Sequence, residues 1–150
     1  MFLLNYFLKK SLTIFCYHDI TNSPSEFCHS YNLFVTPNTF NYQIGFIKKH
    51  FNVINPDQLL NGELPNNAAL VTFDDGYKDN LTVVAPIMEE LKIPFTVFVT
   101  TDFISNKNKT YMDTSMLKEL SDLKGVTIGS HTKSHPRLTE CNEKDAMEKL

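Results

Sequence analysis

Two acidic residues stand side by side in the stretch LVTFDDGYKDN, directly after an apolar run. Asp74 and Asp75 would repel each other at the end of a buried strand unless a cation neutralised one of them. Adjacent carboxylates also occur in solvated turns and at helix caps, so the pair alone does not decide between a catalytic and a structural role.

A second stretch, GSHTKSHPRL, carries His131 and His135 four residues apart. If a helical turn follows the strand there, both imidazoles face one point. Two histidines at this spacing are more often ordinary surface or packing residues, but two neutral imidazoles with one carboxylate make a metal site that leaves positions open for water and substrate. Asp75 is expected to supply that carboxylate, which leaves Asp74 as a general base for water activated by the metal.

The rest of the sequence predicts the elements that position these residues. Apolar and β-branched runs predict strands over residues 11–18, 68–73, 94–100 and 126–132, with a short one at 51–54. A helix is expected to begin at Pro37 after a Thr36 cap, and another over 80–92, where Pro86 should kink the helix or delay its start. Further helices are expected over 115–123 and beginning within 139–150. Residues 19–35 are expected to be a polar loop and residues 55–67 a connecting turn region.

This alternation of strands and helices, with strands apolar on both faces, predicts a parallel α/β sheet or barrel. The polar residues His18, Asp74, Asp75, Ser130 and His131 follow three of the strands, and the carboxyl ends of strands are where such folds carry their chemistry. Phe40, Ile44 and Ile47 form one apolar stripe on the first long helix, which predicts a face packed on the core.

Composition narrows the function classes. A chain of 150 residues is one domain by length, and its net charge of −3 favours neither nucleic acid nor an anionic membrane as partner. Cys16, Cys28 and Cys141 lack the spacing of a disulfide framework or a zinc knuckle and are expected to be reduced, buried thiols. The apolar start lacks a basic region and a cleavage site and is too short to span a membrane, so we expect an N-terminal extension and favour a cytoplasmic over an exported protein.

The two motifs resemble a known family. TFDDG and SHTKSHP are similar to the first two motifs of the polysaccharide deacetylases, carbohydrate esterase family four, and so are YHDI, PFTVFVTTDFI and VTPNTFNYQIGFIKKHFNVINPDQLL. The resemblance divides the chain into an extension at 1–11 and a deacetylase domain at 12–150. It implies a distorted, incomplete (β/α) barrel, and a hydrolase that removes N-acetyl, less often O-acetyl, groups from a polysaccharide containing N-acetylglucosamine.

The same resemblance implies roles for single residues. Asp74 becomes the catalytic base, and Asp75, His131 and His135 become the ligands of a divalent metal, usually zinc. His18 matches the YH motif of the circularly permuted poly-N-acetylglucosamine deacetylases and is assigned as the general acid, with a histidine that only lines the pocket as the alternative. The residues expected to contact substrate or to support the site are Gly76, which would let the backbone turn beneath the substrate, Tyr77, and Thr132 and Ser134, which would orient the metal histidines.

Part of the family pattern is absent. No arginine–aromatic–proline motif follows His135, and Arg137, directly after the second motif, does not replace it. We therefore expect a chain truncated at its C-terminal side within the barrel. Two alternatives stay open, namely an inactive remnant or carbohydrate-binding pseudoenzyme that keeps the metal site, and a hydrolase of a small acetamido substrate. The sequence names neither the polysaccharide nor an oligomeric state.

Overall fold

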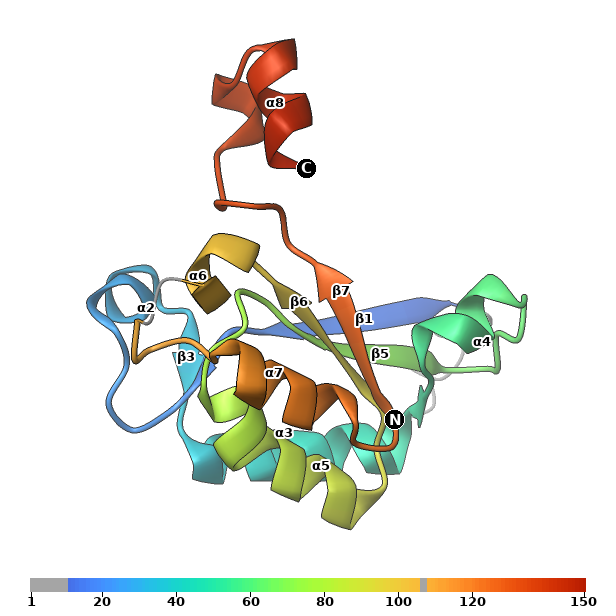
Figure 1. Ribbon diagram of the computed structural model, residues 1–150. Coiled ribbons are helices and arrows are strands. Elements are labelled where there is room, and N and C mark those ends of the chain that lie inside the picture. Colours follow the sequence, from blue (N-terminus) through green and yellow to red (C-terminus); the bar gives the residue numbers. More distant parts are fainter. Residues whose placement is uncertain (1–10, 106–107) are drawn as a thin grey trace.

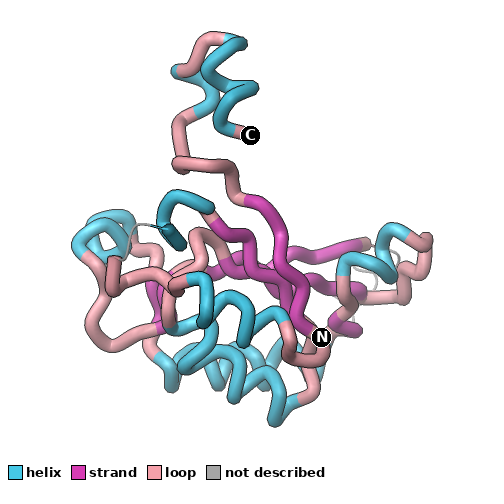
Figure 2. Tube along the Cα trace, in the orientation of Figure 1, coloured by secondary structure: helices cyan, strands magenta, loops and turns pink. Residues whose placement is uncertain are grey.

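The computed structural model describes residues 11–105 and 108–150, which form a parallel sheet with helices packed on one face (Figure 1; Figure 2). The strands are β1 (Leu12–Tyr17), β4 (Asn52–Val53), the central β5 (Ala68–Phe73), β6 (Phe95–Val99) and β7 (Val126–Ser130). Strand β5 pairs with β1 on one side and with β4 and β6 on the other, and β7 pairs with β6. All these pairings are parallel, which confirms the predicted α/β class.

Three helices cover the same face of the sheet, as Figure 1 shows. They are α3 (Pro37–His50), α5 (Ala85–Leu91) and α7 (Thr114–Ser121). The predicted stripe of α3 is fully buried in one hydrophobic cluster with Phe73 and Val97 of the sheet. The Thr36 cap is confirmed, because its side chain accepts a hydrogen bond from the Thr39 amide at 3.2 Å.

Two segments predicted as loops contain short elements. Residues 19–35 hold β2 (Asp19–Ile20), α2 (Glu26–Tyr31) and β3 (Phe34–Val35), and residues 55–67 hold α4 (Pro56–Leu60). Both helices are shorter than two turns and depend on their caps, Ser25 for α2 and an Asn55–Gln58 capping box for α4. The loop prediction was wrong there because hydrophobic periodicity does not detect a helix of five or six residues.

The delay at Pro86 is confirmed, since a π-helical segment, η1 (Asn80–Val84), precedes α5 and places the proline in the first turn of the α-helix. A short α6 (Thr101–Ser105) follows β6 and was not predicted. After β7 come a 3₁₀ turn, η2 (Leu138–Glu140), and α8 (Glu143–Lys149). Figure 1 shows α8 beyond the end of β7, apart from the other helices.

The strands differ in how well their two faces are covered. β5 is buried throughout, whereas β1 alternates, with Phe15 and Tyr17 packed towards the helices and Ile14 and Cys16 exposed on the other face. The prediction of buried thiols therefore holds for Cys28 and is wrong for Cys16. The predicted extension at 1–11 lies almost wholly outside the described residues. Among the helices described here, each is too short or too polar to cross a membrane.

Candidate metal centre and hydrolytic site

The pairing of β1 with β5 brings His18 next to Asp74. Tyr17 is the register partner of Phe73, and the Asp74 amide donates a hydrogen bond to the Tyr17 carbonyl at 2.9 Å. The two following side chains approach each other, with His18 Nε2 3.9 Å from Asp74 Oδ2 and each side chain 20% exposed. The predicted base and acid therefore share one solvent-accessible position at the carboxyl ends of two strands.

Asp75 turns away from Asp74 into the protein. Its φ of +73° and the φ of +79° at Gly76 make two consecutive left-handed residues, which reverse the chain immediately after the strand. The Asp75 side chain is only 2% exposed, and its Oδ1 lies 3.5 Å from His131 Nε2 and 3.4 Å from His135 Nε2. The structure thus brings together the three side chains predicted as metal ligands.

The two histidines lie on a loop, not on the helical turn that their spacing predicted. Thr132 and His135 have φ values of +68° and +53°, which no right-handed helix contains. The Thr132 hydroxyl accepts a hydrogen bond from the His135 amide at 3.0 Å, and the Thr100 hydroxyl donates to the His131 carbonyl at 3.1 Å. The predicted meeting of the imidazoles is confirmed, with ring centroids 4.9 Å apart, but a side-chain-capped turn produces it.

The residues fit a divalent cation. Oδ1 of Asp75 is buried without a hydrogen-bond partner among the described residues, a costly state for a carboxylate oxygen unless a cation lies beside it. Burial raises the pKa of Asp75 while the neighbouring histidines lower it, so an uncompensated negative charge is unfavourable there. Zinc–ligand bonds of about 2.0–2.2 Å in a tetrahedron separate the ligand atoms by about 3.3–3.5 Å. The contacts of 3.4 and 3.5 Å match that spacing.

Gly76 and Tyr77 pack in the protein interior at the turn that follows Asp75. A Cβ atom on Gly76 would lie 3.1 Å from Val99 Cγ1 and 3.2 Å from Ile104 Cδ1, so the absence of a side chain lets this left-handed turn pack closely against the protein. Tyr77 is 1% exposed and its hydroxyl accepts a hydrogen bond from Cys28 Sγ at 3.1 Å. Both residues therefore contribute to the packing around the turn that carries Asp75.

Thr132 and Ser134 make hydrogen bonds that fix the loop carrying His131 and His135. Ser134 accepts a hydrogen bond from Lys149 Nζ at 3.2 Å, which ties the loop to α8. Thr132 acts through its contact with the His135 backbone. Each therefore shapes the loop through the backbone or through α8.

Sequence reasoning missed Cys16. Its Sγ donates a hydrogen bond to Asp74 Oδ2 at 3.3 Å. Burial and the Asp74 charge raise the pKa of this thiol to about 11, so the sulfur is protonated at neutral pH. The signal was the alternation of side chains in a strand, because Cys16 precedes His18 by two residues and must lie on the same face.

An aromatic column next to His135 was also missed. The ring of Phe103 stacks on that of Tyr111, with centroids 4.4 Å apart, and lies 6.1 Å from the imidazole of His135. Tyr111 in turn contacts the ring of Tyr77 at 4.9 Å. These residues come from three separate segments, so no local pattern in the sequence connects them.

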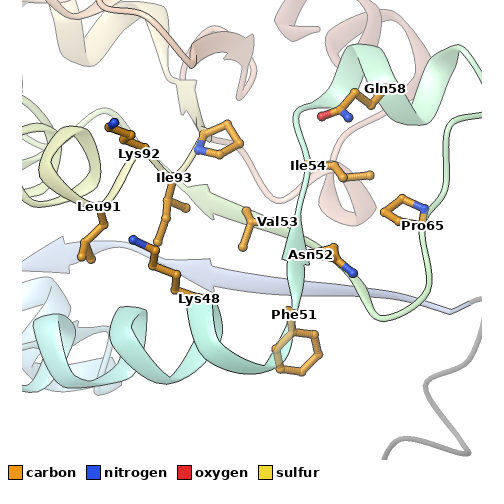
Figure 3. Close-up of a pocket in the computed structure, with 11 residues that line it drawn as sticks. Lys48, Phe51, Asn52, Val53, Ile54, Gln58, Pro65, Leu91, Lys92 and Ile93 are labelled. Atoms are coloured by element: carbon orange, nitrogen blue, oxygen red, sulfur yellow. The ribbon is translucent and has the colours of Figure 1, made fainter.

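Two other features lie outside this site. Arg137 is exposed and pairs with Glu140 at 3.2 Å, in agreement with the expectation that it does not contact Asp74. Figure 3 shows a pocket around β4, at the amino ends of the strands and thus opposite the site. The described residues that line it include Lys48 and Lys92 but no acidic, histidine, serine or cysteine side chain, so they offer no group for hydrolysis.

Comparison with known proteins agrees with this geometry. Residues 61–150 match the family model described as polysaccharide deacetylase. Over 69 residues, 46% of the chain, the sequence is 33% identical to YxkH of Bacillus subtilis (strain 168), which is named as a polysaccharide deacetylase. That match covers 24% of YxkH.

Solved structures extend the likeness to almost the whole chain. The deacetylase PplD of Streptococcus pyogenes, solved in complex with acetate, superposes with a TM-score of 0.80 at 25% identity over 95% of this chain and 65% of its own. IcaB from Ammonifex degensii superposes with a TM-score of 0.71 at 24% identity over 91% of this chain and 57% of its own, which shows a shared fold. The chain thus spans less than two thirds of the length of these relatives.

Proposed function

The chain belongs to the polysaccharide deacetylase family, and from this membership we propose that it is a metal-dependent hydrolase that removes N-acetyl groups from a polysaccharide containing N-acetylglucosamine. One observation carries the proposal. A buried carboxylate oxygen, without a hydrogen-bond partner in the described part of the chain, lies within 3.5 Å of two imidazole nitrogens, and the preceding residue carries a second, solvent-accessible carboxylate. PplD was solved with acetate, the product that such a reaction would release.

In this proposal Asp75, His131 and His135 hold a divalent cation, most simply zinc for a set of two imidazoles and one carboxylate. The bound cation supplies a Lewis acid for the acetyl carbonyl and for water. Asp75 brings the negative charge that balances the cation, and the Thr132-capped turn holds His135 in position.

Asp74 and His18 move the protons. Asp74 takes a proton from the attacking water, and the water oxygen then bonds to the acetyl carbon. The carbon–nitrogen bond breaks when His18 gives a proton to the departing amine, so the products are acetate and a free amino sugar. The 3.9 Å between Asp74 Oδ2 and His18 Nε2 lets both groups act on one acetamide.

The direct test is acetate release from N-acetylglucosamine oligomers, with one equivalent of zinc per chain and with a chelator. We expect zinc-dependent release, reduced about 10²- to 10⁴-fold in Asp74→Asn because the base is lost. Asp57→Asn, at an exposed carboxylate in the first turn of α4, is the matched control and is expected to keep the wild-type rate. Absence of release from folded, zinc-loaded protein would contradict the proposal for this chain.

A protein that binds carbohydrate without hydrolysing it is the second candidate. It is favoured by the surroundings of Asp74, whose side-chain contacts among the described residues are with Cys16 and His18 and include no arginine. Oligomer binding without acetate release, unchanged in Asp74→Asn, would support this candidate. A small acetamido substrate, the third candidate, is distinguished by rates that do not rise with oligomer length.

A further inference from the structure

A second set of metal-binding side chains adjoins the proposed centre. Cys16, His18 and Asp74 each offer one ligand atom, and these atoms all lie within 4.8 Å of one another. None of the three belongs to the first set, although Asp74 and Asp75 are neighbours in the chain. We propose that Cys16, His18 and Asp74 form a second zinc site, whose occupation stops the hydrolysis that depends on Asp74 and His18.

The distances suit the ion. A tetrahedral zinc with a Zn–S bond of about 2.3 Å and Zn–N and Zn–O bonds of about 2.0–2.2 Å separates sulfur from the other ligand atoms by about 3.5–3.7 Å, and nitrogen from oxygen by about 3.3–3.5 Å. Cys16 Sγ lies 3.3 Å from Asp74 Oδ2, and His18 Nε2 lies 3.9 Å from the same oxygen. Small side-chain movements that widen the first separation and narrow the second would therefore place the three atoms at corners of a tetrahedron, with water at the fourth.

The backbone that holds these ligands is already in place. Cys16 pairs in register with Thr72, and the Asp74 amide is hydrogen-bonded to the Tyr17 carbonyl. Two ligands thus come from β1 and the residue after it, and the third comes from the end of the adjacent β5. Ligands on paired strands are more precisely placed than ligands on a loop.

Solvent reaches the site directly. Cys16 is exposed, and a surface pocket bordered by Asn32, Phe34 and Gln43 opens onto Cys16 and His18. A zinc ion arriving there displaces the proton that Cys16 shares with Asp74, and this proton passes to solvent. The set of one sulfur, one nitrogen and one oxygen differs from that of the first centre, and it suits zinc or cobalt better than magnesium or calcium.

The consequence follows from the proposed function, on which this part of the inference rests. Zinc on Asp74 takes the lone pair that would accept the proton from water, and zinc on His18 takes the nitrogen that would protonate the amine. Zinc bound at the first centre alone therefore activates the protein, and zinc bound at the second site inhibits it.

Cobalt reports thiolate ligation without any need for activity. Titration of the full chain with Co²⁺ is expected to produce thiolate-to-cobalt charge-transfer absorption in the near ultraviolet. The absorption should persist in Asp75→Asn and in the matched cysteine control Cys141→Ser, and disappear in Cys16→Ser. A wild-type protein without this absorption, or a Cys16→Ser variant that keeps it, would overturn the second site.

Stoichiometry provides the second readout. Equilibrium dialysis against zinc should give two ions per chain for the wild type and one for Cys16→Ser, and circular dichroism should show that the variant is folded. If Cys16→Ser does not fold, His18→Gln carries the test, with an expected loss of about tenfold or more in affinity for the second ion alone. A single ion bound by folded wild type contradicts the inference.

Activity then connects the site to inhibition. Each protein is compared with its own rate at one equivalent of zinc, and excess zinc should slow the wild type but not Cys16→Ser. If two ions bind and the charge-transfer absorption appears, but no acetate is released at any zinc level, the second zinc site is supported and the proposed function is contradicted. If acetate is released while only one ion binds and the absorption is absent, the proposed function is supported and the second zinc site is contradicted.

Discussion

Oδ1 of Asp75 lies 3.4 Å from Nε2 of His135, is buried, and has no hydrogen-bond partner within residues 11–105 and 108–150. An oxygen in this state is unfavourable in the metal-free protein, because burial raises the pKa of Asp75 and an ionised carboxylate there lacks compensation. The same oxygen becomes favourable once a cation lies between it and the imidazoles. Stability should therefore rise with metal in the wild type and depend little on metal in an Asp75→Asn variant.

Thermal unfolding tests this relationship. In a Cys16→Ser background, which removes the second proposed site, zinc at about 100 times its dissociation constant should add about 2.7 kcal/mol and raise Tm by about 5–10 °C. The shift should be nearly lost when Asp75→Asn is added. With chelator, the Asp75→Asn protein should be at least as stable as its parent, because a neutral amide replaces the unpaired carboxylate. A full zinc shift in the Asp75→Asn protein would exclude this residue as a ligand.

His18 can be tested through the leaving group. An amine must be protonated as it departs, whereas a phenolate from an aryl acetate leaves without help. His18→Gln is therefore expected to slow N-acetyl hydrolysis about 100-fold or more, and aryl acetate hydrolysis less than about tenfold. His29→Gln, at an exposed histidine of α2, should change neither rate. Equal losses on both substrates would assign His18 to the pocket wall and not to proton transfer.

The carboxyl group of Asp79 is expected to make the stability of the protein depend on pH. Burial and a hydrogen bond with Asp19 raise the pKa of Asp79 from its usual 3.8 to about 8, although the Ile20 amide donates to the same carboxylate. The folded state thus binds this proton more tightly than the unfolded state, so the free energy of unfolding contributed by Asp79 falls as pH rises from about 4 to about 8.

Asp79→Asn should remove that fall. Its Tm, measured relative to the wild type by circular dichroism, is expected to be lowest near pH 4 and to gain steadily towards pH 8, the window set by the two pKa values. Asp122→Asn, at an exposed carboxylate after α7, should show a constant difference from the wild type. A difference for Asp79→Asn that stays flat across the window would mean that Asp79 is ionised throughout.

The fold could be predicted from the sequence where long-range burial leaves a periodic pattern. The stripe Phe40, Ile44 and Ile47 and the continuous apolar run of β5 both predicted their place in the core, because helix and strand periods differ. The positions of Asp74 and Asp75 followed from the end of that strand.

The features that the sequence did not predict are details of local geometry. His131 and His135 meet through a turn with two left-handed residues, and the contact of Cys16 with Asp74 depends on the register of β1 against β5. Neither backbone angles of non-glycine residues nor strand register can be read from a single sequence. The site was therefore predictable in its residues but not in how the chain holds them.

Gly76 offers the sharpest test of that support. It has a φ of +79°, and a Cβ atom there would lie 3.1–3.2 Å from Val99 and Ile104. Gly62 has a similar φ of +75° but no atom within 4 Å of the added Cβ, so it carries the backbone strain without the crowding. Gly62→Ala should cost about 1–2 kcal/mol of unfolding free energy from the left-handed conformation alone.

Gly76→Ala should lose the same unfolding free energy from backbone strain and about 1–3 kcal/mol more, because Val99 and Ile104 must move in a close-packed region. Urea denaturation with chelator present measures both variants, and their difference isolates the crowding. Because Asp75 precedes Gly76 directly, Gly76→Ala should also weaken zinc binding in the Cys16→Ser background, whereas Gly62→Ala should leave it unchanged. Equal costs for the two glycines, with equal zinc affinity, would show that the turn holding Asp75 does not depend on this close contact.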